Sequence, residues 1–522
     1  MRRERPAGAP APVATAVAAR PVAAPSVSGT AVRRPRTRIL LTTEGTYPYF
    51  MGGVTSWCEL LVRRLVDFDW QVLPVIPAHG RPPLYELPDH AQQLTPIELW
   101  SERIPHGLPL GNAERRAGVE IPALLVRGLI AWDGDTGALL EALTWCRRHP
   151  AGVRRAFRSR RAWQRFREAL ETVLAERVPQ AGTPPQVDLV EASLLYQSLY
   201  WVARTAAVET PETDVLLVTA AGWAAIPAIV HKTLNGTPMI LTEHGVYVRE
   251  AYLAGARSGT SPGARFISTR LSRGLACAAY AIADVVSPVT PANARWEQGL
   301  GVHPDKIHVV HNGLAAPPEA TAPPGNRTVV SVGRIDPLKD IHTMLRAAGE
   351  ALRHVPDATF LHYGPVTVGE ESYDRSCRSL HAQLALGDRF RFMGQTNDPT
   401  GVVRAADVVL MSSISEALPM AILEAMGVGR PVVSTGVGGV RDVVKGCGVV
   451  APPGDAHALA MGVVTLLRRP SLAMTLGRRG HRRLGRIYND DACVSGYRDL
   501  LRAAAGGLRP VPSTANVPRI AA

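Results

Sequence analysis

The chain has few features of membrane-spanning, disulfide-bonded or metal-stabilised proteins. No run approaches the roughly eighteen apolar residues that a membrane helix requires, and the longest candidates, such as residues 220–230, indicate buried core helices. Six cysteines are scattered along 522 residues, without a C-x-x-C pair or a metal-ligand spacing. We therefore expect buried free thiols in a reducing compartment.

Motifs of several nucleotide-dependent enzymes are also missing. A nicotinamide enzyme needs G-x-G-x-x-G after its first strand. The best approximation here, residues 436–441, comes late in the chain and has no third glycine. The P-loop G-x-x-x-x-G-K-[ST] does not occur. These absences exclude the common dinucleotide and P-loop chemistries, and we expect no cofactor.

Positive charge is abundant but unevenly placed. Eight Arg and one Glu give residues 1–38 a net charge of +7, out of +13 for the whole chain. This stretch is rich in Ala and Pro and lacks aromatic residues, so it cannot bury enough apolar surface to offset the entropy of ordering. We expect a disordered basic tail over residues 1–36, which either contacts an anionic lipid or polymer or is inert. Prolines and arginines interrupt its apolar runs, which argues against a signal peptide. Without aromatic interleaving, the charge does not indicate nucleic-acid binding.

Short apolar segments alternate with helical ones, which indicates an α/β protein with parallel sheets covered on both faces. Strands are expected near residues 38–43, 71–76, 215–219, 238–242, 284–287, 307–311, 328–332, 358–363, 389–393, 407–411, 431–435 and 447–451. A Pro/Ala/Gly-rich stretch at 313–326 reads as a linker. The pattern predicts two such domains, 37–312 and 327–487, with a cleft between them.

Two segments depart from this alternation. Residues 80–190 are too long for an ordinary loop, and we expect a helical insertion there. Within it, residues 153–177 read as a helix with Trp163, Phe166, Leu170 and Val173 on one face, opposite many arginines. Such a helix either packs on a domain, which we favour, or meets a membrane surface or acidic partner. A last helix is expected at 488–505, followed by a tail at 506–522.

The segment Ser415–Met426 places two carboxylates eight positions apart. Pro419 suits the first position of a helix, so Glu416 is expected in the preceding loop and Glu424 within the helix. Free N–H groups at a helix start bind anions such as phosphate, and carboxylates accept hydrogen bonds from hydroxyls. A ligand that combines phosphate and polyol fits both, although two solvated glutamates on a surface helix are an alternative.

Upstream, Arg334 and Lys339 follow the strand-like residues 328–331. Arg grips a diphosphate bidentately and Lys acts as a point charge. Lys339 is one of four lysines among 58 basic residues, so random surface placement is a weaker explanation than usual. No Asp-x-Asp pair suited to a divalent metal lies in this segment. The two cations are therefore expected to neutralise a diphosphate without the help of a metal ion.

The front of the chain reads as strand, loop, glycine pair and helix. Gly52 and Gly53 would let the backbone approach a phosphate or sugar closely, or they simply form a strand-to-helix turn. His244 follows the predicted strand 238–242 and precedes a glycine, so it lies at a strand's carboxyl end, where ligands of α/β sheets bind. Its alternative is a structural histidine that caps a turn.

These residues carry a family resemblance. Arg334, Lys339, Glu416 and Glu424, in this order, resemble the donor site of retaining glycosyltransferases of family 4. These enzymes have the GT-B fold of two Rossmann-like domains facing each other across a cleft, which implies an acceptor domain at 37–312 and a nucleotide-sugar domain at 327–487. The segments T-E-G-T-Y-P-Y…G-G-V, T-E-H-G-V-Y and S-E-x-x-P-x-x-I-L-E-A-M together resemble the subgroup of Pel exopolysaccharide glycosyltransferases, the PelF-like proteins. The resemblance covers roughly residues 37–505 and is weakest between about 80 and 185.

The resemblance implies a hexosyltransferase that uses a nucleoside-diphosphate sugar, a UDP-sugar such as UDP-glucose, and a saccharide acceptor in exopolysaccharide or glycoconjugate synthesis. It implies that Glu424 holds the ribose hydroxyls, that Glu416 contacts the donor sugar, and that a neutral His244 stabilises the oxocarbenium-like transition state. It also implies that the helix at 488–505 crosses back onto the first domain. The expected catalytic residues are His244, Arg334, Lys339 and Glu416. The expected donor-binding residues are Gly52, Gly53, Arg334, Lys339, Glu416, Leu418, Pro419, Met420 and Glu424.

We expect a cytoplasmic protein at the inner face of the cell membrane, as a peripheral partner of a membrane polysaccharide-export complex. Two other functions stay open: a nucleotide-sugar epimerase of similar architecture, and a non-catalytic sugar-binding scaffold of such a complex. An epimerase would convert the donor without any acceptor, and a scaffold would not consume it.

Overall fold

The computed structural model describes residues 36–77, 82–101, 110–176, 185–257, 260–315, 317 and 320–507. The chain divides into two units, Met1–Arg36 and Thr37–Ala522, and the description below concerns the second. The predicted tail at 1–36 lies outside the described residues except for Arg36. The same holds for 508–522 of the predicted second tail, for residues 316, 318 and 319 of the predicted linker, and for parts of the predicted insertion.

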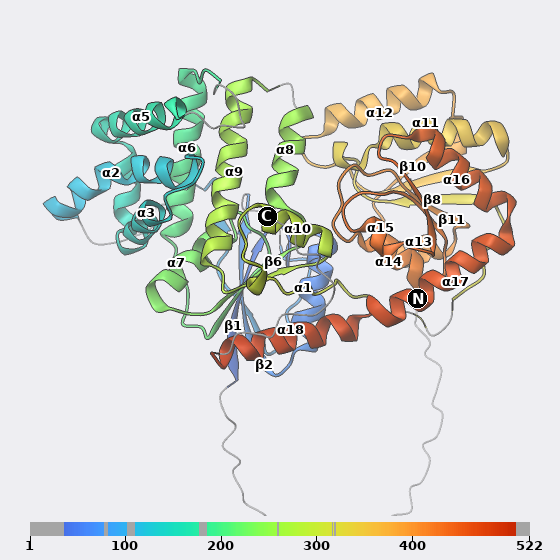
Figure 1. Ribbon diagram of the computed structural model, residues 1–522, viewed down its shortest axis with the longest axis horizontal. Coiled ribbons are helices and arrows are strands. Elements are labelled where there is room, and N and C mark those ends of the chain that lie inside the picture. Colours follow the sequence, from blue (N-terminus) through green and yellow to red (C-terminus); the bar gives the residue numbers. More distant parts are fainter. Residues whose placement is uncertain are drawn as a thin grey trace, which may run out of the picture. The chain divides into compact units, whose positions relative to one another are not determined.

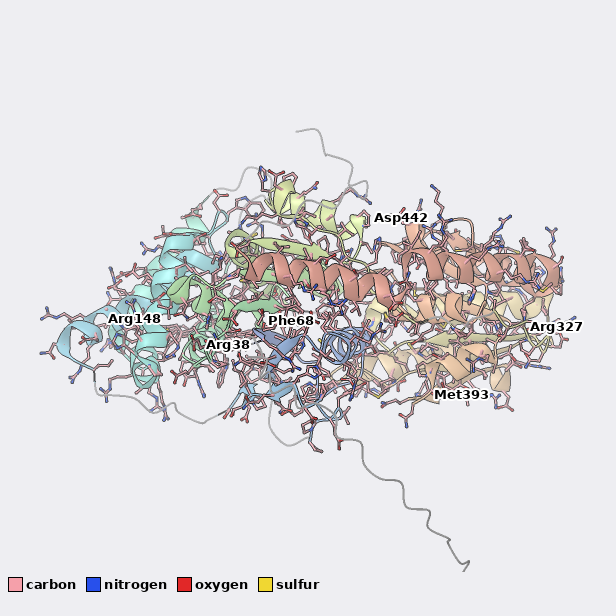
Figure 2. All side chains as sticks on the ribbon, turned by 90° about the horizontal axis from the view of Figure 1, so that it is seen from below. Arg38, Phe68, Arg148, Arg327, Met393 and Asp442 are labelled. Atoms are coloured by element: carbon pink, nitrogen blue, oxygen red, sulfur yellow. The ribbon has the colours of Figure 1, made fainter. Side chains whose placement is uncertain are left out.

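Within the described residues, the first sheet has parallel strands in the order β3-β2-β1-β5-β6-β7, and β4 also pairs with β2. Its strands are β1 Thr37–Glu44, β2 Phe68–Ile76, β3 Ala91–Gln93, β4 Ile97–Glu98, β5 Val215–Val218, β6 Met239–Glu243 and β7 Val285–Pro288. Arg38 and Phe68 lie at the starts of the neighbouring strands β1 and β2 (Figure 2).

The second sheet is also parallel in the described part of the chain, in the order β10-β9-β8-β11-β12-β13. Its strands are β8 Thr328–Val332, β9 Thr359–Tyr363, β10 Phe390–Gly394, β11 Val408–Met411, β12 Val432–Thr435 and β13 Gly448–Ala451. In both sheets the strand order reverses beside the first strand, as in Rossmann-like domains, whose ligands bind at that point beyond the carboxyl ends of the strands. The predicted α/β fold of two such domains is confirmed.

Helices connect these strands. The described α-helices are α1 Gly53–Arg64, α2 Asn112–Leu129, α3 Thr136–Arg148, α4 Pro150–Phe157, α5 Arg160–Ala175, α6 Leu189–Ala206, α7 Ala225–Asn235, α8 Tyr247–Arg257, α9 Pro262–Ile282, α10 Pro291–Gly299, α11 Ile341–His354, α12 Glu371–Gln383, α13 Pro399–Arg404, α14 Met420–Gly427, α15 Val440–Val443, α16 Ala456–Arg468, α17 Pro470–Ile487 and α18 Asp490–Ala505. Short 3₁₀ helices are η1 Pro304–Lys306, η2 Pro337–Lys339 and η3 Gly387–Arg389.

Alternate residues of the strands enter cores on opposite faces of each sheet, because side chains of a strand alternate. In β1, Leu40 packs with residues of α2–α7 and α9, whereas Ile39 and Leu41 pack with residues of α1 and α18. In β11, Val408 and Leu410 face α11 and α16, and Val409 and Met411 face α14 and α15. Figure 1 shows α11 and α16 beside β8 and β11. The apolar runs of the strands therefore reflect burial on both faces.

The expected strand at 307–311 is wrong. Ile307 forms an isolated bridge with Val286, and the backbone N–H groups of His308 and Val310 donate to the carbonyls of Val286 and Pro288. A continuing parallel ladder would require an N–H from Pro288, which proline lacks. The segment therefore runs along β7 without becoming a strand.

The predicted insertion contains strands as well as helices. Its first part holds β3 and β4, which are too short and too polar to be recognised from periodicity. The helix expected at 153–177 is interrupted at Arg158 and Ser159, and Ser159 caps α5. Phe166, Leu170 and Val173 are buried, and Trp163 packs against the same core. The apolar face therefore packs within the domain. Figure 2 labels Arg148 at the end of α3 in this helical group.

The last helix, α18, begins at Asp490 rather than at residue 488, because Asn489 is its N-cap. It packs on the first sheet: the hydroxyls of Tyr497 and Thr242 lie 3.1 Å apart, and Arg64 on α1 donates to Asp490 at 2.9 Å. Figure 1 shows α18 alongside the labels of β1 and β2.

None of the described helices is by itself long and apolar enough to span a membrane. One pair of helices, Ala456–Arg468 and Pro470–Ala505, has the required length and composition together, and it is bent by 105°.

Candidate active site

The first part of the site is the loop between β8 and α11. The Asp336 carboxylate accepts from the N–H of Leu338 at 2.8 Å, which fixes η2 and places Lys339 at its end. The backbone of β9 closes on this loop, and Gly364 has a φ of 155°. A Cβ at that position would lie 1.9 Å from the Gly333 carbonyl oxygen, so a glycine is required.

The second part is the loop after β11, which is hydrogen-bonded to the first. The Ser412 hydroxyl donates to the carbonyls of Lys339 and Asp340, at 2.8 and 3.0 Å, and the N–H of Ile414 donates to the carbonyl of Leu338 at 2.9 Å. The reversal of strand order between β8 and β11 brings these loops together. Cationic and acidic side chains that are 77 residues apart therefore share one site.

Lys339 and Glu416 form the centre of this site. Lys339 Nζ donates to Glu416 Oε1 at 2.5 Å, and the Ser413 hydroxyl donates to the same oxygen at 2.7 Å. The Glu416 side chain is 10% exposed and that of Lys339 is 26% exposed. Arg334 is exposed, and its side chain has no hydrogen bond or ion pair with the described residues. The loop thus presents one free cation and one that is held by a carboxylate.

The helix α14 carries the second carboxylate. It begins at Met420, with Pro419 as N-cap, one position later than the sequence indicated. Its first N–H groups have no acceptor within the helix. Glu424 is partly buried and has no hydrogen-bond partner among the described side chains, and burial raises the pKa of its carboxyl to about 7. Leu418 and Pro419 are buried, and Met420 is partly buried.

The glycine pair lies at the start of α1. A Cβ on Gly53 would lie 3.1 Å from Cγ of Met420, whereas Gly52 has no neighbour within 4 Å of that position. The beginning of α1 therefore approaches the beginning of α14. This contact leaves space for a ligand beside Gly52 and not beside Gly53.

His244 follows β6, as predicted. Its ring contacts Trp57 of α1 edge to face, with centroids 4.6 Å apart. Both ring nitrogens are buried, and neither has a hydrogen-bond partner in the described part of the chain. Burial lowers the pKa of His244 to about 3, with a smaller opposing contribution from the Asn312 side chain. The imidazole is therefore neutral at physiological pH.

Sequence reasoning missed the contribution of α8. Arg249 is 9% exposed, and its guanidinium donates to the Glu416 carbonyl at 3.3 Å. The next residue, Glu250, reaches solvent, but protein crowds its carboxyl and raises its pKa, while Arg249, Lys339 and Arg334 oppose the shift. The signal was present in the sequence, because both residues follow the T-E-H-G-V-Y segment within one helical turn.

A pair of buried carboxyls, Glu243 and Glu297, was also missed, and Glu243 directly precedes His244. Glu243 accepts from the Tyr280 hydroxyl at 2.5 Å and from the N–H of Tyr247 at 3.1 Å. Burial raises its pKa to about 7, and burial beside Glu243 raises the pKa of Glu297 well above its ordinary value. One shared proton between the two carboxyls fits these directions.

The described residues contain no group of three or more His, Cys, Asp or Glu side chains placed to hold a metal ion. The site offers a ligand charged side chains from both domains. They are Arg334, Lys339, Glu416 and Glu424 on the second domain, and Arg249 and Glu250 of α8 on the first.

Two Rossmann-like domains with this arrangement define the GT-B class of fold. HepE from Anabaena, solved with UDP and glucose, matches with a TM-score of 0.55 and 16% identity over 90% of this chain and 100% of that one. Sucrose-phosphate synthase from Thermosynechococcus elongatus matches with a TM-score of 0.59 and 17% identity over 91% of this chain and 100% of that one. At these identities the likeness shows the fold.

The chain belongs to the family described as "Domain of unknown function (DUF3492)", whose model matches residues 37–305. Residues 326–469 match the model described as "Glycosyl transferases group 1". The second half of the chain therefore contains a glycosyltransferase group 1 domain.

Curated relatives are similar to part of the chain. The D-inositol 3-phosphate glycosyltransferase of Saccharomonospora viridis is 30% identical over 228 residues, which are 39% of this chain and 52% of that protein. The lipopolysaccharide core biosynthesis glycosyltransferase LpsE of Rhizobium meliloti is 32% identical over 177 residues, 33% of this chain and 49% of that protein. The chain thus spans about half the length of these relatives.

Proposed function

We propose that the protein is a retaining glycosyltransferase that moves a hexose from a UDP-sugar to a saccharide acceptor. The observation that carries the proposal is the contact between Lys339 and Glu416, with the free Arg334 on the same loop, at the point where the strand order of the second sheet reverses. This arrangement provides cations for a diphosphate and a carboxylate for a sugar hydroxyl in one place.

The donor's diphosphate binds between Arg334, Lys339 and the first N–H groups of α14. Breaking the bond between the sugar and the phosphate builds negative charge on the phosphate, and fixed cations stabilise this charge most strongly in the transition state. Arg334 and Lys339 thereby do the work of a metal ion. The diphosphate competes with Glu416 for Lys339, which frees that carboxylate to accept from a hydroxyl of the donor sugar.

The ribose binds at Glu424. Its carboxylate lies on α14, eight residues after Glu416, and has no partner among the described residues, so both of its oxygens can accept hydrogen bonds from the two ribose hydroxyls. Gly52 and Met420 border the donor where α1 and α14 approach each other, whereas Met420 fills the space beside Gly53.

The reaction takes place between Glu416 and His244. The bond between the anomeric carbon and the phosphate oxygen breaks, and its electron pair leaves with UDP. The acceptor hydroxyl attacks the same face, its oxygen bonds to the anomeric carbon, and its proton passes to a phosphate oxygen. A cationic imidazole would destabilise the oxocarbenium-like transition state, whereas a neutral His244 accepts or donates a hydrogen bond there.

The three sequence segments that resemble the PelF-like subgroup support a role in exopolysaccharide or glycoconjugate synthesis. We propose a cytoplasmic enzyme that associates peripherally with a membrane export complex, with the arginines of residues 1–36 in contact with anionic lipid.

Thermal unfolding of the full chain with UDP, GDP and ADP, each titrated separately, tests the donor. UDP at a hundred times its Kd should stabilise the protein by about 2.7 kcal/mol, and GDP and ADP should stabilise it less. If no nucleotide shifts the unfolding temperature, the donor assignment is wrong.

A further inference from the structure

A cavity of about 530 Å³ lies beside the Glu416 loop. Its walls come from α8 and α10 of the first domain and from the loops after β11 and β12 of the second. Saccharides and other small ligands occupy cavities of about 300–1,000 Å³. Ser415 lines it directly before Glu416, so its occupant would lie next to the site proposed for the donor sugar.

The lining of this cavity is cationic. It includes the guanidinium groups of Arg249 and Arg295, and none of its lining residues is acidic. Arg249 is nine-tenths buried, and its Nε is buried without a hydrogen-bond partner among the described residues. The Ser415 hydroxyl is likewise buried and unpartnered. Buried polar groups are normally hydrogen-bonded, and each exception indicates a missing partner. Both groups belong to residues that line this cavity, and they lie just beneath its surface.

The α10 wall adds an aromatic surface. Ala292, Arg295, Trp296 and Gly299 lie at helical spacing on one face of α10, and this face lines the cavity. Trp296 is 43% exposed, and Arg295 is exposed without a partner in the described structure. The C–H face of a sugar ring packs on an aromatic ring, and a guanidinium grips a carboxylate or phosphate bidentately. Both groups on one helical face fit a sugar that carries an anionic substituent.

We propose that this cavity is the acceptor subsite, and that it takes a saccharide bearing a carboxylate or a phosphate. Arg249 and Arg295 bind the anionic group, and Trp296 packs against the ring. The role of this cavity as an acceptor subsite rests on the proposed function, whereas the binding of an anionic saccharide can be measured without turnover. Arg249 also donates to the Glu416 carbonyl, so the occupied subsite contacts the donor site directly.

The test is calorimetric binding to the full chain of a hexuronic-acid disaccharide, a hexose phosphate, and the neutral sugar matched to each. We expect the anionic ligands to bind about tenfold or more tightly than their neutral partners, as one charge-assisted hydrogen bond implies. The disaccharide and the hexose phosphate distinguish a carboxylate from a phosphate. Arg295→Gln and Trp296→Leu change exposed residues and should fold, so the outcome does not depend on the buried Arg249.

Arg295→Gln should clearly reduce the preference for the anionic ligand, because only Arg249 then remains to bind the anionic group, and should leave the weak affinity for the neutral ligand unchanged. Arg353→Gln, an exposed arginine of α11 outside the cavity, is the matched control and should change neither. Equal affinities for anionic and neutral ligands in the unaltered protein would overturn the proposal, as would equal losses in the Arg295→Gln and Arg353→Gln variants. Failure of the proposed function has a different signature: no nucleotide binds, whatever the cavity prefers.

Discussion

Lys339 and Glu416 are joined by an ion pair of 2.5 Å between Nζ and Oε1, across two loops that follow neighbouring strands. The Ser413 hydroxyl bonds the same carboxylate oxygen. Without a donor, the charges of Lys339 and Glu416 therefore neutralise each other, although both side chains are largely buried. A diphosphate that binds Lys339 replaces this partner and releases the carboxylate toward the sugar.

Replacing Lys339 or Arg334 with alanine should lower turnover by about 10²–10³, because a fixed cation acts on charge that develops in the transition state. The affinity for the donor should fall less than turnover does. Steady-state rates and equilibrium donor binding measure the two effects. Lys445→Ala, an exposed lysine on another loop, is the control and should leave both unchanged. A reaction that stops with chelator and resumes with magnesium would mean that a metal does this work.

Glu424→Ala and Glu416→Ala should separate nucleotide binding from sugar binding. Loss of the ribose contacts in Glu424→Ala should weaken the binding of free UDP by about 1.5–3 kcal/mol, the contribution of a charge-assisted hydrogen bond. Glu416→Ala should spare free UDP and damage transfer. Calorimetry with UDP measures the first effect and initial rates the second. Equal weakening of UDP binding in both variants would contradict this division.

The Glu424 carboxyl should make both the stability of the protein and its affinity for UDP depend on pH. Because burial raises the pKa of Glu424 to about 7 from 4.5, the folded protein keeps a proton that the unfolded chain releases between those values. The free energy of unfolding should therefore fall as the pH rises through this window. UDP binding should strengthen as the pH rises through about 7, because hydroxyls donate to the charged form. Glu424→Gln should remove both dependences.

His244→Ala should greatly reduce transfer while folding and UDP affinity stay intact. Since burial lowers the pKa of His244 to about 3, no titration of this residue should appear in the rate between about pH 5 and 9. A structural histidine that caps a turn would need a hydrogen bond, which neither ring nitrogen makes within the described residues. His457→Ala, on an exposed surface, is the matched control. Near-normal turnover of His244→Ala would assign the residue a structural role.

Deleting residues 1–36 should abolish co-sedimentation with anionic vesicles. This tail carries several arginines. Each arginine near an anionic lipid surface contributes about 1 kcal/mol of binding free energy. Neutral vesicles serve as the control and should retain neither form. If the full and truncated proteins sediment equally with anionic vesicles, the tail does not mediate the association.

Periodicity predicted the fold because most strands are buried on both faces and read as apolar runs, as Ile39, Leu40 and Leu41 do in β1. It failed at 307–311, because Pro288 of the neighbouring strand has no N–H to continue the ladder. It also failed where strands are short and polar, as in β3. The order of charged motifs along the chain predicted two loops at strand ends. Only the strand order, which no local pattern contains, brings Lys339 to Glu416. Arg249 was missed because it donates its hydrogen bond to the backbone carbonyl of Glu416, which lies in the other domain.

The anomeric outcome of donor turnover tests the central claim most directly. The full chain is incubated with UDP-glucose in chelator, and proton NMR follows the released UDP together with the first anomer of the sugar product, whether water or a saccharide is the acceptor. We predict UDP release with a product that keeps the donor's configuration, and a large loss of both in Lys339→Ala but not in Lys445→Ala. Donor conversion to another UDP-sugar without release of UDP, an inverted first product, or no consumption of any UDP-hexose would contradict it.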